Sequence, residues 1–328
     1  MYLYRPQGFA LENLEHLGTK PLGSCQRNLN SYFLTRELNM KLYAISDLHL
    51  SSPENRQALK ELPPHPEDWL IVAGDVTRSI PRFRAAFTLL ADRFARVFWT
   101  PGNHDLWTVD PGGREARGLF KYNELVAVCR SLGVITPEDP YVFWPESDSP
   151  LFIAPIFTLY DYTFSAEGVR PDTAVSWAAA AGLECADENL LYADPFPSRA
   201  AWSAARCRYT ERRLNKTAVL GRMILVNHFP LRQELVNLPR IPRFSIWCGT
   251  QQTEDWHIRF PVTAVIYGHL HTPDSRLIDG VRFEEVSLGY PRHWDQSLGL
   301  NAYLRQILPT PADPASQPSR LPQMQQFG

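Results

Sequence analysis

The fold of this chain is decided by the run Lys41-Leu42-Tyr43-Ala44-Ile45-Ser46 and by the Asp47-Leu48-His49 that follows it. The run has the composition of a buried strand, and the two polar side chains come where that strand ends. Asp47 and His49 are two residues apart, so both point to the same side of an extended chain. We therefore expect a strand that delivers a carboxylate and an imidazole to one point.

Four further motifs repeat this design along the chain. They are Gly74-Asp75-Val76, Gly102-Asn103-His104-Asp105, Asn227-His228-Phe229 and Gly268-His269-Leu270-His271. Each comes at the end of a strand-like run or just beyond it, where ligand sites collect in α/β sheets. Five such motifs in order, all carrying carboxylate, imidazole or amide groups, indicate one shared site.

A mixture of Asp, Asn and His side chains favours a transition metal or Mn²⁺ over Ca²⁺, because imidazole suits ions of borderline softness. His269 and His271 repeat the spacing of Asp47 and His49. A glycine before Asp75 lets the backbone turn sharply, and the two oxygens of that carboxylate can bridge two ions. Two ions about 3.5–4 Å apart activate water and clamp the oxygens of a phosphoryl group.

Strand and helix patterns alternate through the middle of the chain. Strand patterns cover residues 69–73, 97–100, 151–157, 222–226, 263–267 and 282–286, and helical patterns cover 54–62, 81–92 and 119–132. The alternation predicts a layered α/β fold. Two more helical patterns, near 173–181 and 198–216, lie in a segment of residues 158 to about 218 that we interpret as a helical cap insertion near the site.

The ends of the chain lack these patterns. We expect residues 1–39 to form an N-terminal extension, residues 40–308 a single catalytic domain, and residues 309–328 a flexible tail rich in Pro, Gln and Ser.

The composition points to a cytoplasmic protein that does not enter membranes. The 328 residues carry a net charge of only −2, so bulk charge gives no sign of a nucleic-acid partner. Five scattered cysteines without CxxC spacing indicate a reducing compartment. We find no apolar run of membrane-spanning length and no secretory signal.

The ordered set D-x-H, G-D, G-N-H-D, N-H and G-H-x-H resembles the calcineurin-like metallophosphoesterase superfamily over residues 40–300. The resemblance implies an α/β/β/α sandwich of two mixed sheets flanked by helices, with two divalent or transition metal ions (Mn²⁺, Fe or Zn²⁺). It implies that one metal is held by Asp47, His49, Asp75 and His271. It implies that the other is held by Asp75, Asn103, His228 and His269. His104 would hydrogen-bond the phosphate or protonate the leaving group, with Asp105 as its hydrogen-bonding partner.

A second, narrower resemblance lies towards the C-terminus. The stretches Ser245–Thr250, Asp255–His257, Tyr267–His271 and Asp279–Pro291 are similar to bacterial metallophosphoesterases related to phosphopantetheinyl hydrolases. Those enzymes remove 4′-phosphopantetheine from carrier proteins by cleaving the phosphodiester to the carrier serine. The resemblance implies a phosphoester substrate on an acidic acyl carrier protein. Arg292, in the loop that closes this segment, is a candidate for binding that substrate.

A basic stretch supports an acidic partner. Residues 199–243 hold ten Lys and Arg against two Glu, although the whole chain is slightly acidic. Arg208, Arg212 and Lys216 are four residues apart and share one helix face. A solvated basic face is an equally common explanation. We nevertheless take Arg208 and Arg212 as candidate substrate-binding residues, because the stretch includes the motif at His228.

Other functions are also compatible with these motifs. Within the superfamily the rivals are a nucleotide phosphodiesterase, a nuclease and a protein phosphatase, and a nuclease would show a basic groove with interleaved aromatic residues. A non-catalytic scaffold on the same fold would have lost metal ligands, and none is lost here. Cys248 is a poor candidate nucleophile because no Cys–His pairing is evident. We expect Asp187 to be a solvated acid.

Overall fold

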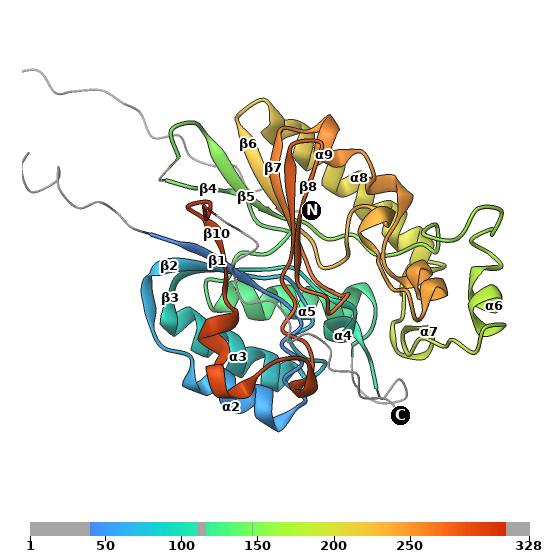
Figure 1. Ribbon diagram of the computed structural model, residues 1–328, viewed down its shortest axis with the longest axis horizontal. Helices are drawn as coiled ribbons and strands as arrows, with labels where there is room; N and C mark the ends of the chain where they lie inside the picture. Colours follow the sequence, from blue (N-terminus) through green and yellow to red (C-terminus); the bar gives the residue numbers. More distant parts are fainter. Residues whose placement is uncertain (1–39, 110–115, 146, 313–328) are drawn as a thin grey trace, which may run out of the picture. The chain divides into compact units, whose positions relative to one another are not determined.

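The computed structural model describes residues 40–109, 116–145 and 147–312, and they form a sandwich of two mixed sheets flanked by helices (Figure 1). The expected extension, residues 1–39, and residues 313–328 of the expected tail lie outside this described part.

The small sheet contains β1 (Leu42–Ile45), β2 (His65–Val72), β3 (Phe94–Trp99) and β10 (Arg305–Leu308), in the order β10-β1-β2-β3. Strands β1, β2 and β3 are parallel, and β10 is antiparallel to β1.

The large sheet has the order β4-β5-β6-β7-β9-β8. Its strands are β4 (Val142–Phe143), β5 (Leu151–Pro155), β6 (Arg222–Val226), β7 (Val262–Tyr267), β8 (Asp274–Ile278) and β9 (Val281–Glu285). The four central strands run parallel, while β4 and β8 are antiparallel at the two edges.

Alternate side chains of each strand pack into different layers, as the period of two requires. Leu42 and Ala44 of β1 join residues of the large sheet such as Ile224 and Ile266 in the apolar layer between the sheets. Ile45 points the other way, into the cluster under the helices. A strand buried on both faces must be apolar throughout, which is why the run before Asp47 carries such a clear signal.

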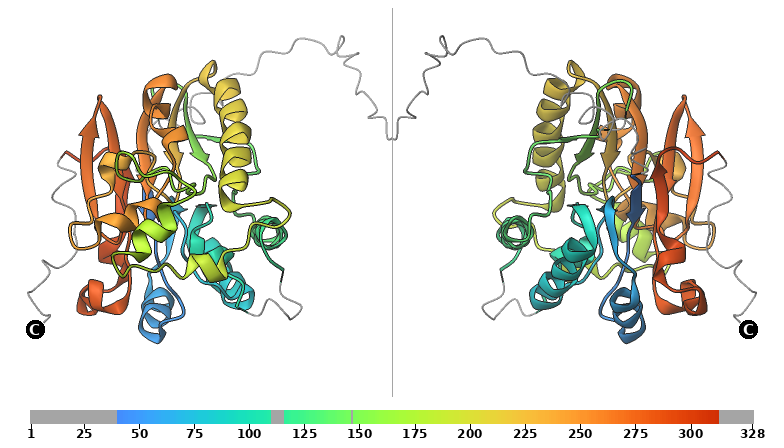
Figure 2. Two further views of the ribbon diagram at one scale, coloured as in Figure 1. Left: turned by 90° about the vertical axis from the view of Figure 1, so that its right-hand side faces the viewer. Right: turned by 90° about the vertical axis from the view of Figure 1, so that its left-hand side faces the viewer.

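Helices cover both outer faces (Figure 2). Those beside the small sheet are α2 (Pro53–Glu61), α3 (Ile80–Arg93) and α5 (Leu119–Ser131). Those beside the large sheet are α8 (Arg199–Ala218) and α9 (Trp256–Arg259). The remaining α-helices of the described residues are α4 (Asn103–Leu106), α6 (Ala174–Ala179) and α7 (Asp187–Leu190). The α/β/β/α architecture implied by the motifs is therefore confirmed.

The segment expected to form a cap, residues 158–218, contains α6, α7 and α8. Cys207 and Leu214 of α8 pack among residues of the large sheet, so this helix is part of the outer helical layer. The limits of a separate cap stay a prediction. No helix of the described residues is both long enough and apolar enough to span a bilayer.

Candidate metal centre

The five motifs meet at the carboxyl ends of the parallel strands. They follow β1, β2, β3, β6 and β7 in turn and contribute Asp47, Asp75, Asn103, His228 and His269. The two sheets are joined at this edge, because Ser46 N donates to Val286 O at 2.9 Å and Leu288 N donates to Ser46 O at 2.9 Å. The join brings motifs from both sheets to one place.

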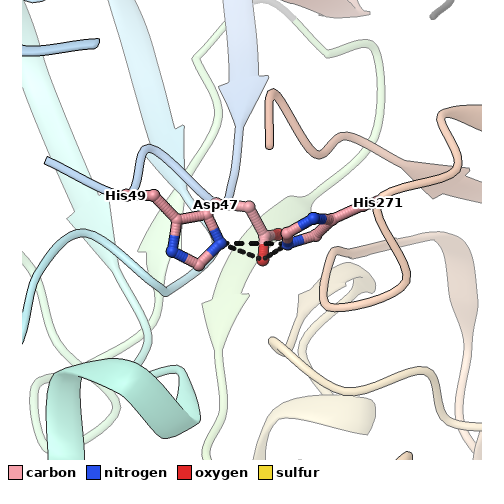
Figure 3. A group of neighbouring side chains, drawn as sticks. All are labelled: Asp47, His49 and His271. Carbon is pink, nitrogen blue, oxygen red and sulfur yellow. Dashed lines mark hydrogen bonds and ion pairs between the residues drawn. The ribbon is translucent and has the colours of Figure 1, made fainter. Parts of the chain in front are cut away.

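Asp47, His49 and His271 form one part of the centre (Figure 3). Oδ1 of Asp47 lies 3.0 Å from Nε2 of His271 and 3.6 Å from Nε2 of His49. The two imidazole Nε2 atoms are 2.9 Å apart. Three potential ligand atoms thus converge on one small volume.

The other oxygen of Asp47, Oδ2, is held by neighbouring donors. It accepts hydrogen bonds from Ser287 Oγ at 2.7 Å and from the backbone amide of His269 at 3.0 Å. Ser46 Oγ lies 2.7 Å from both Oδ2 and Ala73 O, and its single hydrogen can go to only one of them. Ser287 was not among the predicted site residues, although its place just after a strand was an available signal.

Asp75 lies between the two parts of the centre. Its Oδ1 is 3.5 Å from Nε2 of His228 and accepts the backbone amide of His104 at 2.8 Å. Its Oδ2 is 3.8 Å from Nε2 of His104 and 4.0 Å from Nε2 of His49. Each oxygen faces a different set of imidazoles, which is the arrangement that a bridging carboxylate needs.

Asn103, His228 and His269 form the second part. Nδ1 of His228 donates to Ala73 O at 2.8 Å, which leaves Nε2 as a lone-pair donor. That Nε2 lies 3.1 Å from Oδ1 of Asn103. Nε2 of His269 is buried and has no hydrogen-bond partner within the described residues. A buried nitrogen without a partner is costly unless a ligand binds it.

Five of these residues have a backbone conformation that L-residues rarely adopt. Their φ values are 55° for Asp47, 41° for His49, 55° for Asp75, 72° for His269 and 54° for His271. Such residues cost of order 1 kcal/mol or more each, and they cluster at functional sites. The strain lies in the motifs themselves and is held by the two sheets.

Two of the motif glycines are required because atoms of another motif lie too close to leave room for a Cβ. A Cβ on Gly74, whose φ is 91°, would lie 2.6 Å from both Gly102 N and His228 Nδ1. A Cβ on Gly268 would collide with Ser46 and with Oδ2 of Asp47. Both glycines therefore let two motifs touch.

The ionisation of the centre in the metal-free protein fits a cation-binding site. Burial, followed by the nearby charges of Asp47 and Asp105, raises the pKa of Asp75 well above its usual range. Burial lowers the pKa of His228 to about 4, so its imidazole is neutral near pH 7. Neutral imidazoles and crowded carboxylates are the forms that bind metal ions.

The residues present fit a pair of metal ions. The centre offers carboxylate oxygens, an amide oxygen and neutral imidazole nitrogens, a donor set that suits Mn²⁺, Fe or Zn²⁺. A bound cation would give the buried Nε2 of His269 a partner. It would also explain why the two Nε2 atoms of His49 and His271 lie so close together.

His104 faces a cavity beside the centre. Its side chain is 22% exposed, and its ring stacks on Trp107 with centroids 3.7 Å apart. The cavity measures about 210 Å³, and its lining includes His49, His104, Trp107, Tyr290 and Arg78. Tyr290 stacks on His49 at 4.3 Å, so an aromatic wall adjoins the ligands. Sequence reasoning did not identify Trp107 or Tyr290.

The expected partnership between Asp105 and the His104 imidazole is wrong. Asp105 is the third residue of α4, so its carboxylate turns back to accept the amide of Gly102 at 3.1 Å. It also accepts the amides of Asp75 (3.1 Å), Val76 (2.9 Å) and Thr77 (3.0 Å). Asp105 thus holds the loop that carries Asp75 and does not touch the ring.

Asp187 is not a solvated acid either. It is completely buried and accepts hydrogen bonds from Asn103 and from Trp107. No motif marks it in the sequence, because it lies in a short helix 84 residues beyond Asn103.

The candidate substrate residues lie at different places. Arg208 and Arg212 are exposed on α8, roughly 14 and 20 Å along that helix from Arg199. Arg199 lies near the centre, where it donates to Asp187 O. Arg292 is also exposed, and its guanidinium is 5.0 Å from the ring centroid of Tyr290. Arg292 is therefore beside the cavity wall, whereas α8 leads away from it.

Cys248 is a buried thiol whose pKa is raised by burial. A neutral, enclosed thiol is a poor nucleophile, which agrees with the expectation that Cys248 is not the nucleophile.

A two-sheet sandwich with this ligand arrangement at its strand ends defines a dinuclear metallophosphoesterase. Comparison with protein families gives the same class, since the model of the calcineurin-like phosphoesterase family matches residues 40–273. The chain belongs to this calcineurin-like phosphoesterase family. It is a metal-dependent phosphoester hydrolase, as the motif order predicted.

Two comparisons define the similarity further. The chain is 44% identical over 272 residues to the acyl-carrier-protein phosphodiesterase PptH of Mycobacterium tuberculosis (strain ATCC 25618 / H37Rv), covering 82% of this chain and 84% of the relative. It is also similar to the crystal structure of phosphopantetheinyl hydrolase (PptH) from Mycobacterium tuberculosis. That match has a TM-score of 0.78 and 43% identity, covering 83% of this chain and 97% of the other.

Proposed function

We propose that this protein hydrolyses the phosphodiester between 4′-phosphopantetheine and the serine of a holo acyl carrier protein, leaving the apo carrier. The observation that carries the proposal is the 44% identity, over most of both chains, to a phosphodiesterase named for the acyl carrier protein. The presence of every metal-ligand motif supports catalysis and speaks against a non-catalytic scaffold.

The seven candidate ligands would hold two metal ions. Asp47, His49, Asp75 and His271 would bind one, and Asp75, Asn103, His228 and His269 would bind the other. Mn²⁺, Fe and Zn²⁺ are the ions that this donor set favours. When bound, such ions add positive charge beside the phosphoryl oxygens and lower the pKa of a water molecule.

His104 would protonate the leaving group. Its side chain lines the cavity, and the stack on Trp107 fixes the plane of the ring. A bound phosphodiester brings negative charge next to Nε2, which favours the imidazolium form. As the oxygen of water bonds to phosphorus, that water would lose a proton to solvent and the bond from phosphorus to the serine oxygen would break. The proton on Nε2 would pass to that serine oxygen, and Nε2 would take up a proton from solvent before the next turnover.

The cavity would receive the pantetheine arm. Trp107 and Tyr290 offer aromatic faces to its methylene groups, and Ser51 and Ser52 offer hydroxyls to its amide groups. A mostly apolar wall with a few polar groups is the usual form of a small-molecule pocket. The arm would then extend away from the metal ligands.

Exposed arginines would recognise the acidic carrier. Arg78 lines the cavity, and its guanidinium has no hydrogen bond or ion pair with any part of the chain that the structure describes. Arg292 lies beside Tyr290. We assign these two to contacts near the carrier serine. Arg208 and Arg212 on α8 would steer the carrier from further away, by long-range attraction.

We propose the cytoplasm as the compartment of this reaction. The four cysteines of the described residues, Cys129, Cys185, Cys207 and Cys248, are all free thiols. Free thiols are the rule where the surroundings are reducing.

The test is to incubate Mn²⁺-loaded protein with holo acyl carrier protein and follow the carrier by intact mass spectrometry. We expect apo carrier and free 4′-phosphopantetheine in equal amounts. Cyclic nucleotides, a phosphoserine peptide and an aryl phosphodiester serve as rival substrates. Hydrolysis of a rival without release of phosphopantetheine would reject the carrier substrate, and hydrolysis of none would favour the scaffold.

A further inference from the structure

Asp187 of α7 makes two contacts beneath the active site with a single oxygen. Its Oδ1 accepts a hydrogen bond from the indole Nε1 of Trp107 at 2.6 Å and from Nδ2 of Asn103 at 3.0 Å. The side chain is completely buried, so bulk solvent does not reach this oxygen.

The contact between Trp107 and Asp187 decides which end of the Asn103 amide faces Asp187. An indole nitrogen can only donate, so the oxygen that it touches must be an acceptor. The same oxygen therefore selects the NH₂ end of Asn103. The amide oxygen is left on the opposite side, where it lies 3.1 Å from Nε2 of His228. With the amide reversed, an NH₂ group would face the second metal position and could not bind a cation.

The contact between Asp187 and Trp107 also affects His104. Trp107 is held by its hydrogen bond to Asp187, and its indole supports the His104 ring with an interplanar angle of 28°. A change in the position of this indole would tilt the imidazole relative to the cavity.

Helix α7 is itself firmly anchored. Arg199 donates to the backbone oxygens of Asp187 at 2.8 Å, Glu188 at 2.7 Å and Leu191 at 2.9 Å. It also pairs with the carboxylate of Glu188 at 2.9 Å, and Glu188 accepts the indole of Trp247 at 2.8 Å. The acceptor oxygen of Asp187 therefore has a fixed place.

We propose that Asp187 is a positioning residue that sets two parts of the site at once: the amide oxygen of Asn103 toward the metal, and the ring of His104 through Trp107. The inference rests on the roles proposed above for Asn103 and His104, but not on the identity of the natural substrate. Aryl phosphodiesters therefore test it even if the carrier substrate is rejected.

The direct test compares Asp187→Leu with Asp187→Asn. Leucine removes the acceptor, whereas the amide oxygen of asparagine can replace it. We expect Asp187→Leu to bind Mn²⁺ at the second position about 10–100-fold more weakly, the range for lost support of a ligand. At saturating Mn²⁺ it should also lose more turnover with a phenyl than with a 4-nitrophenyl leaving group. Asp187→Asn should stay within a few-fold of wild type on both measures. Equal damage in both variants, or wild-type behaviour of Asp187→Leu, overturns the proposal.

A control separates this role from general loosening of α7. Glu188 lies on the same helix as Asp187, and Glu188→Gln weakens its ion pair with Arg199 of α8 while leaving Asn103 and Trp107 untouched. We expect a lower melting temperature but unchanged Mn²⁺ stoichiometry and leaving-group dependence. If Glu188→Gln reproduces the metal and leaving-group defects of Asp187→Leu, the positioning role is rejected.

An exchange of the two side chains tests the pair even if Asp187→Leu does not fold. Asn103→Asp alone places two carboxylates against each other. Adding Asp187→Asn removes this repulsion, because its NH₂ group can donate to the new carboxylate from the place of Oδ1, although that group no longer accepts from Trp107. We expect the double variant to bind Mn²⁺ at least about tenfold more tightly than Asn103→Asp, in line with outer-ligand effects. A double variant no better than the single one contradicts the proposal.

Discussion

The hydroxyl of Ser287 lies 2.5 Å from Oε1 of Glu285, and its other neighbour is Oδ2 of Asp47 at 2.7 Å. A hydroxyl has one hydrogen, so it can donate to only one of these carboxylates. Both contacts are hydrogen bonds only if one of the two carboxyl groups carries a proton. Burial favours Glu285 for that proton, since it is the main cause that raises the pKa of Glu285 to about 7.

We expect the titration of Glu285 to make the stability of the metal-free protein depend on pH. Because the pKa of Glu285 is raised on folding, its contribution is complete below pH 4.5 and is lost as the pH rises to 7. The loss amounts to roughly 3 kcal/mol. Glu285→Gln should lack it, so the variant should gain on wild type across this window. Urea unfolding in chelator at pH 4.5, 5.5 and 7 measures the difference, and a pH-independent difference would refute it.

His104→Asn should lower kcat by about 10²–10⁴-fold, the range for lost acid–base help. The loss should be smaller for a 4-nitrophenyl ester, which needs little protonation of its leaving group. Metal content, measured by plasma mass spectrometry, should not change. His104 also lies near enough to His49 and Asp75 to act as a ligand, so loss of one ion from the variant would show that it binds metal instead.

Chelation should abolish hydrolysis, and Mn²⁺ should restore it better than Mg²⁺, since imidazoles would contribute to both proposed metal positions. Among changes of single candidate ligands, Asp75→Asn should be the most damaging because both ions would depend on this carboxylate. Dialysed protein is assayed after each metal is added back. Full activity without metal would be incompatible with the assigned class.

Gly74→Ala should weaken metal binding and lower stability. The new Cβ would meet Gly102 N and His228 Nδ1 at 2.6 Å, and φ is 91° at this position. Strain of this kind costs of order 1–3 kcal/mol. Gly133→Ala is a matched control, because its φ of 72° carries similar strain but its Cβ meets no atom within 4 Å. Thermal melts and Mn²⁺ titration compare the two, and the metal defect should appear only at Gly74.

Reversing Arg208 and Arg212 to Glu should raise KM for acyl carrier protein and weaken its dependence on salt, because these charges would act by attraction at a distance. Turnover of a small aryl phosphodiester should be unaffected. Arg292→Glu, beside the cavity, should raise KM more strongly. Steady-state kinetics at two ionic strengths measures both effects, and equal losses on both substrates would point to a damaged site.

The features that could be predicted from the sequence are those encoded locally. Runs such as residues 41–46 are apolar because both faces of the strand are buried, and a ligand after each run marks the shared edge. The strands expected at 222–226 and 263–267 are present at β6 and β7 with nearly the same bounds.

Features that depend on contacts between distant segments escaped prediction. Asp187 has no periodic or motif context, and only the docking of α7 brings it to Asn103. The predicted partner of Asp105 was wrong, because Asp105 lies in the first turn of α4 and its carboxylate there faces backbone amides. Its position next to His104 in the sequence does not determine where the carboxylate points.

The hydrogen bond between Asp47 and Ser287 spans 240 residues of chain. At the usual rate of about 5–20 residues per second, the ribosome needs roughly 12–48 s to make the second residue after the first. Until residue 271 is made, Asp47 lacks both Ser287 and His271, so the early strands cannot complete the site before the late strands exist. Metal uptake should therefore be among the last events in the biogenesis of the enzyme, and a nascent chain stalled before β7 should be catalytically silent.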